Sequence, residues 1–235
     1  MDLHQILSGI DVRADWIGLR YVKENTGFRL VRDGKPEANT RESKQGVMVE
    51  VLVNGQFAYY GTSRLDKPGI QAAAERAVKL ATAASKFSLH SFGVDARPVA
   101  KGSYSSPYQT AADAFSPGEL SDLLIKATAE LKVSDKVVTT NAMARTVETE
   151  SHFVASNGSD VDQKYLMVSA DYSAIAHDGS VTQKRTDGGL LAKSYQAGME
   201  VFDEAAVLAR CRNIGAEAVE LLTAEECPTG TMDLV

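Results

Sequence analysis

The sequence contains little cysteine, no excess of positive charge and no long apolar run. Its only cysteines are Cys211 and Cys227, and two thiols do not make the disulfide framework on which small secreted domains depend. No apolar run reaches the ~18 residues that a transmembrane helix needs. The first residues also lack the basic segment with which a secretory signal begins. We therefore expect reduced thiols, no membrane partner and a cytoplasmic location.

The charge balance and the missing motifs argue against several classes of function. The 235 residues carry 25 lysines and arginines against 31 aspartates and glutamates, a formal net charge of -6. Surfaces that bind nucleic acid are rich in positive charge, so we expect no direct contact with DNA or RNA. The sequence has no G-x-S-x-G, no G-x-G-x-x-G and no H-E-x-x-H motif. We therefore predict no catalytic residue, no metal ligand and no cofactor in this chain.

Residues 45–86 give the clearest indication of structure. Apolar residues alternate over 47–53, which predicts a strand with one apolar face. The Asn54-Gly55 pair is typical of a tight hairpin turn, and 57–61 would be the returning strand. A helix should begin after Asp66, and its largely alanine stripe would let it pack closely on the strands in a two-layer α+β unit. The stripe consists of Ile70, Ala73, Ala74, Ala77, Ala81 and Ala84.

The rest of the chain predicts a similar mixture of strands and helices. Ser116, Pro117 and Glu119 have the form of a capping box, which indicates the start of a second long helix. A last helix should begin near Asp203. The other expected elements are a short helix at 2–9 and strands at 15–23, 28–32, 38–43, 137–154, 166–174, 181–185 and 198–202.

The composition indicates two domains joined by a linker. Residues 85–116 are rich in serine, glycine and proline and show no sustained period, as in a connection between domains. We predict an N-terminal domain over 1–90, a linker over 91–115 and a central domain over 116–226, with 227–235 beginning a further domain. Each of the two units would be α+β, a mostly antiparallel meander sheet covered by helices. The apolar strand that starts at the end of the sequence favours a fragment of a longer protein.

Thr62, Ser63 and Arg64 are the candidates for substrate binding. They lie between a predicted strand and a helix N-terminus, where free amide groups and the helix dipole favour a carboxylate or carbonyl of a peptide. The alternative is that these residues do no more than cap the helix and form the loop before it.

A second group, Glu148, Glu150 and His152, alternates along a predicted strand. Alternate residues of a strand share one face, so the three side chains would lie together as a candidate metal site. The alternative is a solvated strand face, which is what alternating polar residues usually form.

Six stretches occur in an order and spacing that cover nearly the whole chain from about residue 14. They are 46–61, the Thr62-Ser63 junction, the alanine-rich helix with Ala73, Ala77 and Ala81, 150–158, 182–185, and Cys227-Pro228-Thr229-Gly230. No single stretch decides the matter, but the ordered set resembles the TldD/PmbA family. Proteins of that family have long been described as modulators of DNA gyrase and are understood as metallopeptidases.

The resemblance implies where the chemistry lies. In that family a zinc-binding H-E-x-x-x-H helix belongs to a C-terminal domain that follows the C-P-x-G segment, and this sequence ends just after that segment. The chain would then be the N-terminal and central part of such a protein, with zinc in the missing C-terminal domain. Some family members lack the zinc motif and act as the partner of one that has it, which implies a homodimer or a heterodimer.

Three functions remain open at this point. The first is the non-catalytic portion of a TldD/PmbA-like metallopeptidase, which would form the peptide-access cavity and dimer contacts in proteolysis or peptide maturation. The second is a stand-alone regulatory or protein-binding module, such as a gyrase modulator or a zinc-less partner subunit. The third is a hydrolase that uses Glu148, Glu150 and His152.

Turns at Asp33, Asn54, Asn157 and Asp178 predict meander sheets with open edge strands. A peptide or a partner protomer can pair with such an edge as an additional strand.

Overall fold

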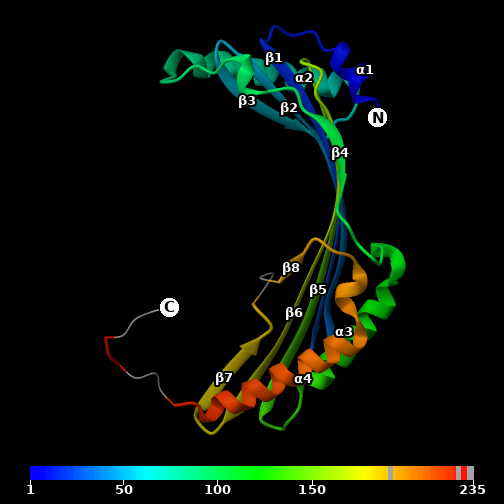
Figure 1. Ribbon diagram of the computed structural model, residues 1–235, viewed down its shortest axis with the longest axis vertical. Helices are drawn as coiled ribbons and strands as arrows, with labels where there is room; N and C mark the ends of the chain where they lie inside the picture. Colours follow the sequence, from blue (N-terminus) through cyan, green and yellow to red (C-terminus); the bar gives the residue numbers. More distant parts are fainter. Residues whose placement is uncertain (190–192, 226–228, 232–235) are drawn as a thin grey trace. The chain divides into compact units, whose positions relative to one another are not determined.

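A computed structural model describes residues 1–189, 193–225 and 229–231 (Figure 1). It contains 32% helix and 42% strand, which confirms the predicted α+β class. The chain forms two compact units, and each unit is assembled from three separate parts of the sequence. Unit 1 comprises Met1–Thr26, Arg41–Pro107 and Val147–Leu166; unit 2 comprises Gly27–Thr40, Tyr108–Thr146 and the described residues from Met167 onward. This spatial division differs from the sequential domains that the composition suggested.

The strands form one sheet in the order β3-β2-β1-β5-β6-β4, and β7 and β8 also pair with β6. Four strands are long, and each contributes residues to both units: β1 (Trp16–Arg32), β2 (Lys35–Val53), β5 (Val137–Ala155) and β6 (Asp160–Asp178). The short strands are β3 (Gln56–Thr62), β4 (Lys101–Ser105), β7 (Val181–Thr186) and β8 (Ser194–Tyr195). The sequence predicted shorter strands at 15–23, 28–32 and 38–43, and the polar residues between them do not interrupt pairing.

Unit 1 has its larger core between the sheet and α2 (Lys67–Ala84). The helix begins as predicted, because the Asp66 carboxylate accepts a hydrogen bond of 2.8 Å from the Gly69 N–H. Five members of the predicted stripe are buried with the valines of β2, whereas Ala84 at the end of the helix is exposed; the buried members are Ile70, Ala73, Ala74, Ala77 and Ala81. The helix α1 (Leu3–Ser8) adds Leu3 to the same core. Small side chains thus bring the helix backbone close to the strands.

The opposite face of the unit 1 sheet carries a smaller aromatic cluster. Trp16 and Leu52 are buried there against Phe57 and Phe153. The segment that follows α2 contains the short 3-10 helices η1 (Ser85–Phe87) and η2 (Val94–Ala96) and contacts this face. The Arg97 guanidinium lies 4.4 Å from the centroid of the Phe57 ring.

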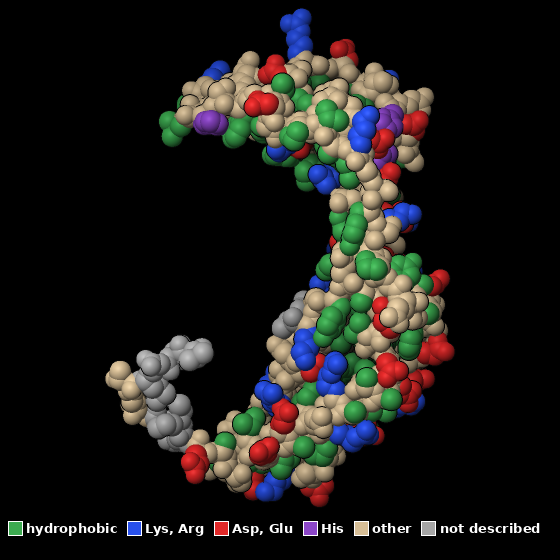
Figure 2. All heavy atoms as spheres, in the orientation of Figure 1, with side chains coloured by type: hydrophobic (Ala, Val, Ile, Leu, Met, Phe, Trp, Pro, Cys, Tyr) green, Lys and Arg blue, Asp and Glu red, His purple; other side chains and the backbone are tan. Residues whose placement is uncertain are grey.

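Unit 2 contains α3 (Pro117–Leu131) and α4 (Glu204–Glu220), which pack against each other, and α4 also contacts β7. The predicted capping box is present: the Ser116 hydroxyl accepts from the Glu119 N–H, and the Glu119 carboxylate accepts from the Ser116 N–H. Asp203 caps α4 in the predicted position. Acidic and basic side chains are interspersed over α3 and α4 on the face that Figure 2 shows.

One local prediction is wrong: the strand expected at 198–202 is a 3-10 helix, η4 (Met199–Phe202). The segment predicted to be a linker contains β4, which pairs in parallel with β6. Further 3-10 helices are η3 (Ala112–Ala114) and η5 (Leu221–Thr223). Within the described ranges no helix is long and apolar enough to cross a membrane. The apolar strand expected at the end of the chain lies largely outside the described residues.

Candidate functional site

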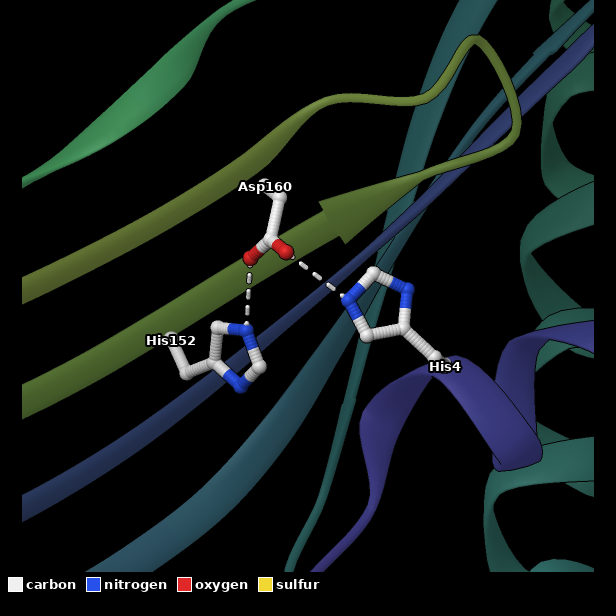
Figure 3. A group of neighbouring side chains, drawn as sticks. All are labelled: His4, His152 and Asp160. Carbon is white, nitrogen blue, oxygen red and sulfur yellow. Dashed lines mark hydrogen bonds and ion pairs between the residues drawn. The ribbon is translucent and has the colours of Figure 1, made fainter.

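Three side chains of unit 1 meet around one carboxylate (Figure 3). His4 lies in α1, His152 in β5, and Asp160 is the first residue of β6. Asp160 Oδ2 lies 2.9 Å from His4 Nε2, and Asp160 Oδ1 lies 3.0 Å from His152 Nε2. The two imidazole rings are 6.0 Å apart, edge to face. We call this group the His-His-Asp cluster.

The backbone holds each member of the cluster in place. Asp2 caps α1 by accepting a hydrogen bond of 3.0 Å from the Gln5 N–H, and Leu3 anchors the helix in the core of unit 1. His4 follows directly and projects toward Asp160 (Figure 3). The Asp160 N–H donates to the Ala100 carbonyl at 2.9 Å, where β6 begins to pair with β4. The cluster therefore depends on three elements that are far apart in the sequence.

The electrostatics of the cluster favour an ionised carboxylate. Hydrogen bonds from His152 and then from His4 hold the pKa of Asp160 below its ordinary value. The side chains of His4, His152 and Asp160 are 58%, 26% and 42% exposed, so solvent reaches the cluster. Two imidazole nitrogens and a carboxylate oxygen, all within 4.8 Å of one another, are a donor set that suits a transition-metal ion.

The strand pattern had suggested that His152 lies beside Glu148 and Glu150. Among the residues that the structure describes, the His-His-Asp cluster is the only group of three potential metal ligands whose donor atoms converge. Glu148 and Glu150 are exposed and do not belong to it. No pattern in the sequence indicated the observed cluster, because His4 and Asp160 are separated by 156 positions and only the fold brings them together.

Of the predicted binding residues, Thr62 is the last residue of β3, and Ser63 and Arg64 follow it in the loop before α2. The Thr62 hydroxyl accepts a hydrogen bond of 3.1 Å from the Arg64 N–H, and Arg64 extends into solvent with one nitrogen 3.4 Å from Asp66. The hydrogen bond from the Gly69 N–H lowers the pKa of Asp66, so a carboxylate already lies at the helix N-terminus. A peptide-binding role for these three residues stays a prediction.

The outer edge of β3 is the second notable feature of unit 1. Asn54 and Gly55 have φ of 51° and 73°, the two-residue turn predicted from the sequence. In such a hairpin Val53 and Gln56 form the first hydrogen-bonded pair, and pairs alternate from there. The N–H and C=O groups that point away from β2 are therefore those of Phe57, Tyr59 and Gly61. Within the described ranges β3 pairs with β2 alone.

Cys211 in unit 2 does not qualify as a nucleophile. It is fully buried in α4, and burial raises the pKa of its thiol to about 12. A thiol of this kind stays protonated and unreactive. Nearby, the almost buried carboxylate of Asp187 forms ion pairs with Lys193 at 2.8 Å and with Arg210 at 3.3 Å. These two cations balance the negative charge of Asp187. Cys227 lies outside the described residues.

Two regions of the sequence match domains of one known protein family. Domain 1 of the PmbA/TldA metallopeptidases matches residues 17–81, and the central domain of the same proteins matches residues 111–224. The chain belongs to the PmbA/TldD family. The resemblance seen in the sequence is thereby confirmed. The two matched regions leave out residues 82–110, the part that contains η1, η2 and β4.

Individual known proteins resemble this chain in sequence or in fold. A protein from Methanothermobacter thermautotrophicus named metalloprotease is 27% identical over 238 residues, which cover 99% of this chain and 49% of that protein. A crystal structure of a candidate modulator of a DNA gyrase from Thermotoga maritima has a TM-score of 0.67 at 17% identity, covering 92% of this chain and 46% of that one. TldE from Thermococcus kodakarensis has a TM-score of 0.65 at 14% identity, covering 88% of this chain and 44% of that one. The chain spans about half the length of these relatives.

Proposed function

We propose that this chain is the peptide-binding, non-catalytic portion of a PmbA/TldD metallopeptidase, and that it holds an extended peptide along the outer edge of β3. The observation that carries the proposal is the free edge itself, with three residues whose backbone groups point away from β2. An edge of this kind satisfies its N–H and C=O groups by accepting another strand. Binding through the backbone tolerates many side chains, as a peptidase acting on varied segments requires.

The surroundings of β3 suit an extended peptide. On the face opposite α2, Met48 and Tyr59 expose 45% and 48% of their surface beside the edge. The Arg97 guanidinium pairs with Glu50 and donates to the Tyr59 hydroxyl at 3.0 Å, which fixes the tyrosine ring. Apolar area next to a row of backbone donors and acceptors offers both parts of strand addition, side-chain contact and main-chain pairing. Thr62, Ser63 and Arg64 continue the edge and would meet one end of the peptide.

The hydrolytic step is assigned to residues that this chain does not contain. Family membership implies a metal, and we propose zinc held by an H-E-x-x-x-H helix in a C-terminal domain of the whole protein. The chain covers about half of its relatives, which leaves room for such a domain. We further propose a homodimer or heterodimer with a family member, and a cytoplasmic location on the ground of the low cysteine content.

Two substitutions of one glycine test the proposal. Gly61→Pro removes an outward N–H from β3, and proline is tolerated at such a position on an edge strand. Gly61→Ala keeps that N–H and places its Cβ in open space, so it is the matched control. We expect a fluorescein-labelled unstructured peptide to bind the wild type and Gly61→Ala alike and to bind Gly61→Pro several-fold more weakly.

Hydrogen exchange supplies the second measurement. Saturating peptide should slow amide exchange at Phe57, Tyr59 and Gly61, the residues whose N–H groups face outward. If peptide binds but protection develops elsewhere, the β3 edge is not the binding site. If no peptide binds and the chain associates only with a folded protein partner, the regulatory or protein-binding module becomes the better account.

A further inference from the structure

We propose that His4, His152 and Asp160 form a binding site for a divalent transition-metal ion of the zinc class, which ties α1 to β5 and β6. Among the described residues no other three such ligands converge. The spacing of histidines along the sequence led to the opposite expectation, that the chain holds no metal. The proposal rests on unit 1 alone and does not depend on peptide binding at β3.

The distances within the cluster lie close to those of a metal site. Zinc binds imidazole nitrogen and carboxylate oxygen at ~2.0–2.2 Å, so two such ligands at a tetrahedral angle lie ~3.4 Å apart. The Asp160 oxygens are 2.9 and 3.0 Å from the two Nε2 atoms. The three donor atoms lie within 4.8 Å of one another, so the farthest pair must move closer, toward ~3.4 Å, to share one ion.

The cluster is held by structure that does not require the metal. Asp160 is fixed by strand pairing, His152 by its place within β5, and His4 by the buried Leu3 beside it. A site whose ligands are already close loses little conformational entropy when the ion binds. Because all three side chains are at least a quarter exposed, an ion here would keep one or more water molecules.

The donor set selects the class of ion. Imidazole suits zinc, cobalt and nickel, whereas magnesium and calcium require mainly oxygen ligands. A carboxylate ligand supplies one negative charge and an imidazole ligand supplies none, so a divalent ion bound here would retain a net positive charge. Such an ion accepts a further oxygen ligand from solvent or from a bound molecule.

Cobalt(II) titration of the metal-free 235-residue chain tests the site, since the visible spectrum of bound cobalt reports both stoichiometry and nitrogen ligation. We expect one equivalent to bind. His152→Gln and Asp160→Asn should weaken binding by more than the ~10-fold that loss of an outer-shell partner already costs. His177→Gln is the matched control, because His177 is an exposed histidine on β6 in unit 2 whose Nδ1 lies 2.9 Å from the Thr182 hydroxyl.

Thermal unfolding with zinc and with a chelator separates binding from folding. Zinc should raise the melting temperature of the wild type and of His177→Gln, because an ion that binds only the folded state stabilises it. It should leave the melting temperature of His152→Gln unchanged, while all three proteins melt alike in chelator. The proposal is overturned if no stoichiometric ion binds, or if His152→Gln and Asp160→Asn bind it as tightly as the wild type and His177→Gln.

Discussion

Ala77 lies at the point where α2 approaches the unit 1 sheet, and no part of it is exposed. A larger side chain there has no space, because Val49 and Val51 belong to the same fully buried cluster. We predict that Ala77→Leu destabilises the chain by ~1–3 kcal/mol, the usual cost of overpacking a filled core. Chemical denaturation measures the change in the free energy of unfolding.

Ala72→Leu is the matched control for this prediction, since Ala72 is an exposed residue of the same helix. The helix propensities of alanine and leucine are similar, so this change should alter the free energy of unfolding by less than ~0.5 kcal/mol. Equal stabilities of the two variants would mean that the alanine stripe does not set the distance between helix and sheet.

Glu200 of η4 forms hydrogen bonds with the backbone of Gln109 and Thr110, in the segment before α3 in unit 2. Its carboxylate accepts hydrogen bonds from the N–H groups of Gly198 at 3.0 Å, Gln109 at 3.2 Å and Thr110 at 2.9 Å. These backbone hydrogen bonds, that of Gly198 first, lower the pKa of Glu200 from 4.5 to about 2. Only the charged form accepts all three well.

The depressed pKa of Glu200 predicts how stability changes with pH. A carboxyl group whose pKa is lower in the folded state stabilises fully above its unfolded pKa of 4.5 and loses that effect as the pH falls through about 2. Glu200→Gln should therefore melt below the wild type at pH 6, and the difference should shrink between about pH 4.5 and pH 2. Glu148→Gln, an exposed change, should follow the wild type at every pH. If the difference in melting temperature between Glu200→Gln and the wild type stays constant with pH, the destabilisation comes from packing and not from the charge of Glu200.

At the scale of elements, local signals in the sequence predicted the helices well. Asp66, Ser116 and Asp203 each cap a helix by accepting from the amide group three positions further on, a contact that depends on neighbouring residues only. A capping residue and an apolar stripe can both be recognised from one continuous stretch of sequence. The α+β class followed from these helices and from the alternation of apolar residues in the strands.

Features that depend on distant residues were not predictable in the same way. The strand β4 has five exposed residues and no apolar alternation, and it exists because its backbone pairs with Asp160–Lys164. The polar residues 24–27 suggest a break, yet β1 continues through them because neighbouring strands supply hydrogen bonds. The His-His-Asp cluster belongs to this group, since its members lie on three elements.

The segment between α2 and β4 is the element that we expect a protease to reach first. Phe87 and Leu89 expose 86% and 105% of their surface there, and the segment has only two short 3-10 helices. Chymotrypsin cleaves after large apolar residues and requires an exposed, flexible backbone. Mass spectrometry of early digestion products should therefore show cleavage after one of these residues. First cuts within α2 or α4 would contradict the assignment of those helices.

For the whole molecule, the long strands mean that each unit is built from residues of both halves of the sequence. Unit 1 takes Val147–Leu166 from the second half of the chain, and unit 2 takes Gly27–Thr40 from the first half. Val154 lies fully buried in the core beside α2, although 70 residues and more separate it from that helix. The family matches at 17–81 and 111–224 follow the order of the sequence, whereas the compact units do not.

This interleaving predicts what happens when the chain is divided. A polypeptide of residues 1–107 lacks Phe153 and Val154 of the unit 1 clusters. A polypeptide of residues 108–235 lacks Asp33, whose carboxylate accepts from the Thr140 N–H at 2.7 Å and whose own N–H donates to the Thr140 carbonyl. We expect neither piece to unfold cooperatively by itself, because each leaves a sheet without its neighbouring strands and a core without its cover.

The two pieces should recover the fold when they are mixed, since every strand partner is then present and only one peptide bond is missing. Circular dichroism and thermal melting of the separate pieces, of the equimolar mixture and of the intact chain measure this directly. The mixture should melt cooperatively, and at a concentration-dependent temperature because association has become bimolecular. Cooperative melting of 1–107 alone would instead favour the sequential domains, in which the first ninety residues form a domain of their own. Only in that case would the edge of β3, where we propose that a peptide binds, be separable from the central region.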